Sequence, residues 1–299
     1  MIFKGRLLFT GRMSLLIAIL CVTQEIHSQS IPPDSINKKR LNTLVVGTAA
    51  AYTASMIVLS EVWYSDFDQQ PFTFFNDSRE WYQVDKVGHF YSTYQLSYFG
   101  SMALQWTGMN KRKSDKIASL TSFLMISSIE IFDGKSSGYG ASGADILANA
   151  VGSSFYLGQQ LLWNQSRIHP KFSFHTTSLA DVRPDVLGST LAEQIIKDYN
   201  GQTYWLSFDM NKFFRFPHWL NFAVGYGAEN MVYANEQDNI DNGYDPYRQY
   251  YLSIDFDLSE IKTKSKAVKT LLYIVNMIKL PSPAIEFSKN GIKTYAFYF

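Results

Sequence analysis

The 299-residue sequence has little cysteine, little charge and no familiar catalytic motif. Cys21 is its single cysteine, which excludes a disulfide framework and a cysteine-based metal site. The net charge is +1, so no basic field points to nucleic acid as a partner. No HExxH, P-loop, GxSxG or Rossmann glycine pattern occurs, so no enzyme class defined by these motifs is indicated.

Aromatic residues are what the sequence has in excess. They make up 16% of the chain, whereas charged residues make up only 18%, below the roughly 25% typical of soluble domains. This balance is typical of aromatic-rich β-structure or of the aromatic belts of membrane proteins. We therefore expect membrane lipids among the partners of this chain.

Residues 1–28 are predicted to be a secretory signal peptide. Three basic residues come first, and the apolar stretch 13–22 that follows is too short to span a bilayer. Cys21 suggests lipidation, but Leu20 precedes it where a lipobox has a small residue. We expect an exported protein of the cell envelope that faces the periplasm and is associated with either the inner or the outer membrane.

An α+β fold is predicted for the rest of the chain. Residues 29–40 form a flexible lead-in, and residues 41–168 form a membrane-associated bundle of about four helices. We expect the helices at 41–64, 86–107, 114–132 and 143–163. The fourth is rich in alanine, glycine and serine, which allow helices to approach closely.

The period changes from 3.6 to 2 in the second half, and residues 169–299 are predicted to be a β-rich region. Residues 203–210, 219–227 and 248–258 each alternate apolar and polar residues, which predicts antiparallel strands with one apolar face. Six candidate strands are fewer than the roughly eight of the smallest membrane barrels. A one-sided sheet covered by helices is therefore expected.

A basic amphipathic helix is predicted near 264–280. Apolar residues recur there at helical spacing between lysines. Such a helix can lie on an anionic membrane surface. Alternatively, it covers the sheet and holds its lysines in solvent.

Three of the predicted helices each carry a pair of polar residues at helical spacing. The pairs are Asp85 with His89, Glu130 with Asp133, and Asp145 with Asn149. Because neighbouring helices run antiparallel, the start of the second helix, the end of the third and the start of the fourth meet at one end. The sequence therefore predicts a polar cluster there.

The first and third pairs also have a structural interpretation. Asp85 suits a helix N-cap, Asp145 forms a capping box with Ser142, and His89 can be a core histidine. The second pair is harder to explain, because carboxylates in the last turn oppose the helix dipole.

Glu130 and Asp133 therefore need a cation, a histidine or a metal nearby, and Lys86 is one candidate. We expect the ligand-binding set Asp85, Lys86, His89, Glu130, Asp133, Asp145 and Asn149.

Three functions fit such a cluster. In the first, it binds a lipid or glycan head group, or a divalent metal through His89, Glu130 and Asp133. In the second, the protein is a metal-dependent hydrolase or transferase acting on lipid-linked envelope precursors, with His89 and Asp85 as acid–base groups. In the third, the cluster is purely structural. Whether the chain is an enzyme stays open.

The motifs of this region resemble a known family. The strings DKVGHF (85–90), EIFDG (130–134) and SGADILANAVG (142–152) resemble the YfiM-like family of uncharacterised periplasmic lipoproteins, and more distantly the VanZ-like membrane family. The resemblance covers about residues 80–165. It implies an envelope location and no defined reaction.

Overall fold

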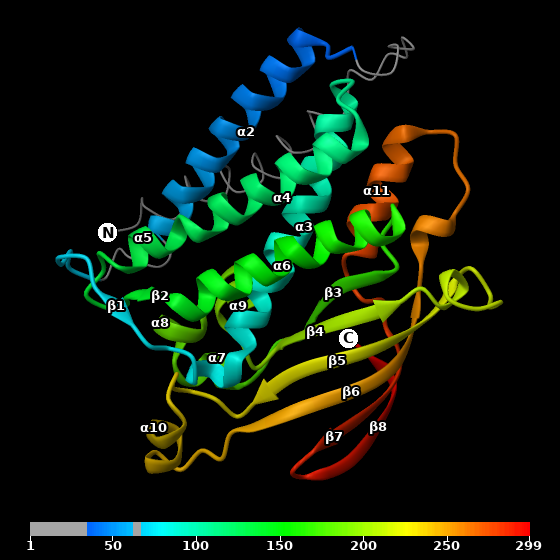
Figure 1. Ribbon diagram of the computed structural model, residues 1–299. Coiled ribbons are helices and arrows are strands. Elements are labelled where there is room, and N and C mark those ends of the chain that lie inside the picture. The colour runs from blue at the N-terminus through cyan, green and yellow to red at the C-terminus, as the bar shows by residue number, and fades with distance from the viewer. Residues whose placement is uncertain (1–34, 62–66) are drawn as a thin grey trace, which may run out of the picture.

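The computed structural model describes residues 35–61 and 67–299, so the signal peptide, Cys21 and the first part of the lead-in lie outside the described residues. Long helices make up the N-terminal half, and a six-stranded antiparallel sheet makes up most of the C-terminal half. Figure 1 shows the long helices as one layer and the sheet as a second layer. The predicted α+β class is confirmed.

Three long helices pack against one another. They are α3 (Val84–Trp106), α4 (Lys111–Ser127) and α6 (Gly143–Trp163). The approach of α6 to α3 depends on Gly152, because a Cβ there would overlap the carbonyl group of Phe90. Small polar side chains fill much of the space between the helices, among them Ser97, Ser101, Ser119 and Ser122, all buried.

Helix α2 (Lys38–Leu59) lies beside this group and buries none of its residues. Asn37 fixes its start, because its side chain accepts the Arg40 N–H and its own N–H donates to the Thr107 carbonyl at 2.7 Å. By length and composition α2 can cross a membrane, a property that signal sequences share. The predicted four-helix bundle is not confirmed, since α2 lacks a buried face.

The third predicted helix, 114–132, is two helices in the structure. α4 begins earlier, at Lys111, and a short helix α5 (Ile129–Asp133) follows it. At the break, the hydroxyl of Ser128 donates to the carbonyl of Met125 at 2.6 Å. α5 then contacts β2 (Ala141–Ser142), the segment directly before α6.

The sheet follows chain order, and each strand is antiparallel to the next. Its strands are β3 (Ile168–Phe174), β4 (Gln202–Phe208), β5 (Leu220–Glu229), β6 (Tyr247–Phe256), β7 (Ser282–Ser288) and β8 (Gly291–Tyr298). The sheet curls until its last strand meets its second: the Tyr298 ring lies 5.7 Å from that of Trp205, and its hydroxyl lies 2.8 Å from that of Thr203.

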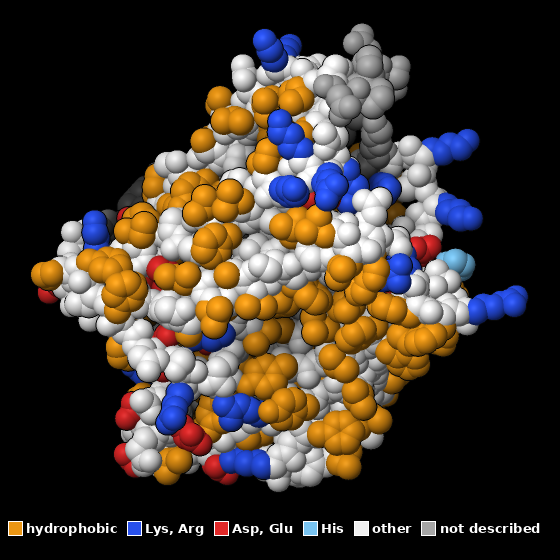
Figure 2. All heavy atoms as spheres, viewed as in Figure 1, with side chains coloured by type: hydrophobic (Ala, Val, Ile, Leu, Met, Phe, Trp, Pro, Cys, Tyr) orange, Lys and Arg blue, Asp and Glu red, His pale blue; other side chains and the backbone are white. Residues whose placement is uncertain are grey.

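The buried positions of the sheet are mostly polar and surround an aromatic cluster of Trp205, Tyr251 and Tyr298. Inside the curl, Lys171 pairs with Asp255 at 2.6 Å, and both side chains are fully buried. The apolar positions that alternate with these face outward: Phe222, Val224 and Leu252 are each 41–50% exposed. Figure 2 shows apolar side chains gathered over the strands and the outer helices. The predicted alternation is present, but the sheet buries the face opposite to the usual one.

The predicted helix near 264–280 is α11 (Lys266–Asn276). It packs on α3 through Tyr273, whose ring stacks on that of Tyr98 at 4.1 Å. Val268, Leu271 and Val275 stay exposed. The shorter elements are β1 (Phe74–Phe75), η2 (Glu80–Gln83), α7 (Leu179–Val182), α8 (Pro184–Leu187), α9 (Leu191–Lys197), η3 (Met210–Lys212), α10 (Glu236–Asp241) and η4 (Leu258–Glu260).

Candidate functional site

The turn before α3 fixes where the polar cluster forms. Trp81, Tyr82 and Gln83 all have left-handed backbone angles, with φ of 46°, 51° and 65°, a conformation that non-glycine residues hold only when their surroundings impose it. Tyr82 supplies that restraint, because its side chain is buried against Met231 and its carbonyl accepts the hydroxyl of Tyr226. The first turn of α3 is thereby anchored to the sheet.

Lys86 lies at the centre of the cluster. Its ammonium group contacts three carboxylates: Asp77, Asp85 at 2.7 Å and Asp145 at 3.0 Å. Lys86 is only 9% exposed, so these charges interact with little screening by water. A buried cation of this kind is held by its partners, and its removal would leave uncompensated charge in the interior.

The carboxyl groups around Lys86 differ in acidity. Burial raises the pKa of Asp85 to about 7 and also raises that of Asp145, although Lys86 opposes both shifts. Asp77 is different, because hydrogen bonds from Lys86 and Ser142 outweigh its burial and lower its pKa. Burial disfavours the charged form of Lys86, but the charges of Asp85 and Asp145 outweigh it and raise the pKa of the lysine.

His89 presents one ring nitrogen to this cluster. Its Nδ1 lies 3.1 Å from the Asn149 side-chain oxygen, and the Asn149 amide nitrogen donates to Ser127 at 3.2 Å. Because the Asn149 oxygen is an acceptor, Nδ1 carries the hydrogen. In the neutral ring, the lone pair is then on Nε2, which lies 3.9 Å from Asp145 Oδ1.

Glu130 reaches the same place from α5. It is 3% exposed, and its Oε2 accepts the N–H of Ser142 at 2.7 Å. Its Oε1 is buried without a hydrogen-bond partner among the described residues. Burial raises the pKa of Glu130 to about 8. One ligand atom each from His89, Glu130 and Asp145 all lie within 4.8 Å of one another.

The structure brings six of the seven predicted site residues into this cluster. Asp133, the last residue of α5, lies close enough for its charge to raise the pKa of Glu130, but it is not among the facing ligand atoms, where Asp145 stands beside His89 and Glu130. The N-cap interpretation of Asp85 is wrong, because Gln83 occupies the N-cap and Asp85 lies in the first turn. The interpretation of Ser142 as the cap of α6 is confirmed by its 3.0 Å bond from the Asp145 N–H.

Two members of the cluster were not predicted as site residues. Asp77 contacts Lys86 and accepts the Ser142 hydroxyl at 2.5 Å. Asp77 lies in an irregular loop, where no periodicity relates it to a helix face. Ser142 was visible as a cap, but its N–H bond to Glu130 depends on the helix break after Ser127.

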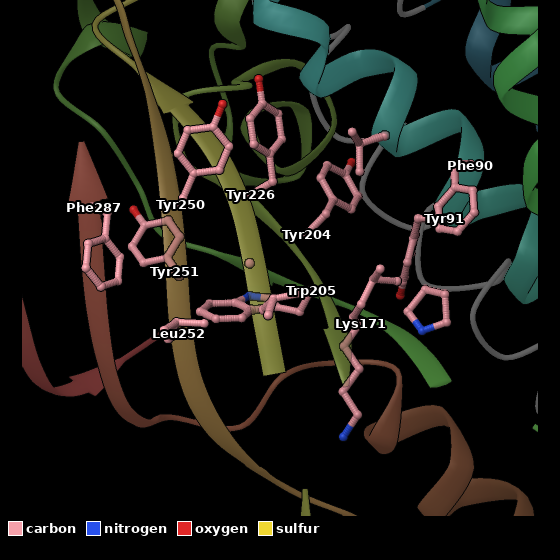
Figure 3. Close-up of a pocket in the computed structure, with 15 residues that line it drawn as sticks. Phe90, Tyr91, Lys171, Tyr204, Trp205, Tyr226, Tyr250, Tyr251, Leu252 and Phe287 are labelled. Carbon is pink, nitrogen blue, oxygen red and sulfur yellow. The ribbon is translucent and has the colours of Figure 1, made fainter. Parts of the chain in front are cut away.

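An apolar cavity of about 540 Å³ lies between α3 and the outer face of the sheet. Figure 3 shows Phe90 and Tyr91 of α3 on one side and Tyr204, Tyr226 and Leu252 of the strands on the other. Val87 also lines it, so the cavity and His89 share the first turns of α3.

Part of the chain matches a known family. Residues 72–159, less than a third of the chain, match a family described as "Predicted periplasmic lipoprotein (DUF2279)". The matched segment contains every residue of the cluster described above. No curated protein and no solved structure matches the chain. The chain is thus similar over this segment to an uncharacterised family of periplasmic lipoproteins, and it is an exported, envelope-associated protein.

Proposed function

We propose that this chain is a membrane-associated envelope protein that holds a divalent metal ion through His89, Glu130 and Asp145. The observation that supports it most is the buried Oε1 of Glu130, which has no hydrogen-bond partner in the described part of the chain. An acceptor left unsatisfied in the interior is costly unless a cation is nearby. His89 and Asp145 supply the other two facing ligand atoms.

The donor set is suited to zinc or manganese. One imidazole nitrogen and two carboxylate oxygens are common ligands of Zn²⁺, and carboxylates also suit Mn²⁺. Asn149 would orient the His89 ligand by accepting the hydrogen bond from its Nδ1, an arrangement usual for metal-bound histidines. Lys86 contacts all three members of the Asp77, Asp85 and Asp145 group, so that group is a poorer cation site. In the proposed site Lys86 contacts only Asp145, where it competes with the metal.

Membrane lipids are the proposed partners. The outer faces of α4 and α6 carry exposed apolar residues, and small polar residues lie between the helices. This is the reverse of the usual pattern for a helix group in water. The exposed residues include Leu120, Leu124, Leu147, Val151 and Leu162. Helix α2, with no buried face, is the proposed anchor.

A second candidate function is metal-dependent hydrolysis or transfer on a lipid-linked substrate. The apolar cavity favours it, because a lipid chain lying there would place its head group near the first turns of α3. In that case the metal would activate water or a phosphate, with His89 and Asp85 close by. Turnover of a lipid phosphate by the purified protein, lost on His89→Ala, would distinguish this function from metal binding alone.

The metal proposal is tested by counting bound ions. The full chain is purified in detergent, loaded with Zn²⁺ or Mn²⁺ and dialysed, and its metal content is measured by mass spectrometry. We expect His89→Ala and Glu130→Gln each to lose one ion per chain. His218→Ala and Glu260→Gln are the matched controls, since these residues form a separate pair in which His218 is exposed.

Two results would contradict the proposal. One is unchanged metal content in both cluster variants. The other is a lower melting temperature in those variants while the wild-type protein binds no metal, which would make the cluster purely structural.

A further inference from the structure

A second group of ligand atoms lies at one end of the sheet, away from the cluster on the helices. His169 is in β3, Asp209 directly follows β4, and Asp257 directly follows β6. β4 and β6 run in the same direction, so their carboxyl ends lie at the same end of the sheet. The start of the antiparallel β3 lies at that end too. The pairing of Ile168 with Phe208 places His169 beside the end of β4.

The three side chains face one another in the interior. One ligand atom from each lies within 4.8 Å of the other two. Asp209 is fully buried and Asp257 is 3% exposed. Three atoms of the group, His169 Nε2, Asp209 Oδ1 and Asp257 Oδ2, are buried and lack any hydrogen-bond partner within the ranges 35–61 and 67–299.

Hydrogen bonds fix the side chain of Asp257 and the backbone of Asp209, and each aspartate keeps a carboxylate oxygen without a hydrogen-bond partner among the described residues. Asp257 Oδ1 accepts three hydrogen bonds, from the Ser259 N–H at 2.8 Å, the Ser259 hydroxyl at 2.6 Å and the Asn276 amide at 3.1 Å. The Asp209 N–H donates to the Arg167 carbonyl at 2.9 Å. One oxygen of Asp257 is thus saturated and fixed, and the other is left without a partner beside His169 and Asp209.

We propose that His169, Asp209 and Asp257 form a binding site for a divalent transition metal, with zinc and manganese as the ions that suit one nitrogen and two carboxylate oxygens. The geometry supports this: one ligand atom from each residue lies within 4.8 Å of the other two, and each residue has a buried atom without a hydrogen-bond partner that a cation would satisfy. With three protein ligands, the ion keeps at least one position for water or another ligand. The site lies outside residues 72–159, the segment shared with the lipoprotein family.

One positive charge is already close. The ammonium group of Lys212 lies 2.6 Å from Asp209 Oδ2 and is 22% exposed. Lys212 therefore competes with a metal for Asp209. The alternative to a metal site is an internal ion pair of Lys212 with Asp209, with His169 placed between the two aspartates and no ion bound.

The test measures zinc in a background where the first cluster is disabled. In the Glu130→Gln protein, we expect one Zn²⁺ per chain to remain and to be lost on adding Asp209→Asn or Asp257→Asn, each with at least about tenfold weaker zinc binding. Asp198→Asn is the control, because Asp198 is equally buried but lies outside the group. Circular dichroism checks that each variant is folded.

Lys212→Met gives a second measurement that does not remove a ligand. If a metal binds Asp209, removing the competing ammonium group should strengthen zinc binding in the Glu130→Gln background. The proposal is overturned if that background binds no zinc with or without Lys212, or if the Asp209 and Asp257 variants bind zinc as tightly as the Asp198 control.

Discussion

Replacing Lys86 by methionine removes a cation that three carboxylates of the cluster share. Asp77, Asp85 and Asp145 all contact its ammonium group, and the lysine is 9% exposed. Breaking a buried ion pair from one side typically costs about 3–5 kcal/mol, because the remaining charge has no partner. We therefore expect Lys86→Met to lower the free energy of unfolding at pH 8 by about that amount.

The cost of this replacement should depend on pH in a defined direction. Burial holds the pKa of Asp85 at about 7 and raises that of Asp145, and loss of Lys86 raises both further. At pH 5 Asp85 is then protonated in the folded variant, so less buried charge is left unpaired. The destabilisation measured by urea unfolding in detergent micelles should therefore be smaller at pH 5 than at pH 8.

Lys289→Met is the control for this prediction. Lys289 pairs with Asp245, and both side chains are exposed, at 41% and 79%, so its loss should cost no more than about 1 kcal/mol. Adding Asp145→Asn to Lys86→Met should recover part of the lost stability, because it removes one of the unpaired charges. The reasoning is refuted if Lys86→Met costs no more than the Lys289 control, or costs the same at pH 5 and pH 8.

Three further predictions concern other parts of the chain. Burial lowers the pKa of Lys279 from 10.5 to about 8. Between these pH values the unfolded chain binds more protons than the folded chain, so the free energy of unfolding should rise with pH by about 3 kcal/mol in all. Lys279→Met should abolish this rise in urea unfolding, and a rise that persists in the variant would contradict the prediction. Gly152→Leu should lower the melting temperature because its side chain would meet the Phe90 carbonyl, whereas Gly158→Ala should not, since nothing lies within 4 Å of that position. Leu162→Ser, at a side chain 77% exposed on α6, should weaken binding to phosphatidylglycerol vesicles while changing stability by less than about 0.5 kcal/mol; unchanged vesicle binding would count against lipid contact there.

The bounds of a helix could be predicted where a capping residue and the apolar pattern marked the same segment. The segment 143–163 was predicted to the residue, because Ser142 caps it and its apolar pattern is uninterrupted. The break at Ser128 was not predicted, since the apolar run continues through it. A serine hydroxyl that bonds back to a carbonyl leaves little trace in the sequence pattern.

The candidate site could be predicted through chain direction alone. Antiparallel helices bring Asp85, His89, Glu130 and Asp145 to one end whatever the details of packing. The predicted metal ligands were His89, Glu130 and Asp133, whereas in the structure Asp145 of α6 supplies the third facing ligand atom. The second group was not predicted, because strand register brings together His169, Asp209 and Asp257, which lie 40 and 48 positions apart along the sequence.

The burial of the sheet could not be predicted from its alternation. A period of two marks two faces but does not say which one is covered. Lys171 and Asp255 are each other's partners only after the sheet curls, and no local pattern links them. The strands were therefore predicted correctly and their covered face was not.

The polar interior of the curled sheet has a consequence for how the chain reaches its native state. In water, hydrophobic collapse favours burial of the apolar face of the sheet. Lys171 and Asp255 would then face the solvent, and the sheet would bury the wrong face. An apolar surrounding reverses this preference, since it accepts Phe222, Val224 and Leu252 and drives the charges together. We therefore expect refolding from urea to succeed in detergent micelles or lipid vesicles and to end in aggregation in plain buffer. The apolar environment of a micelle or membrane would then determine which face of the sheet is buried.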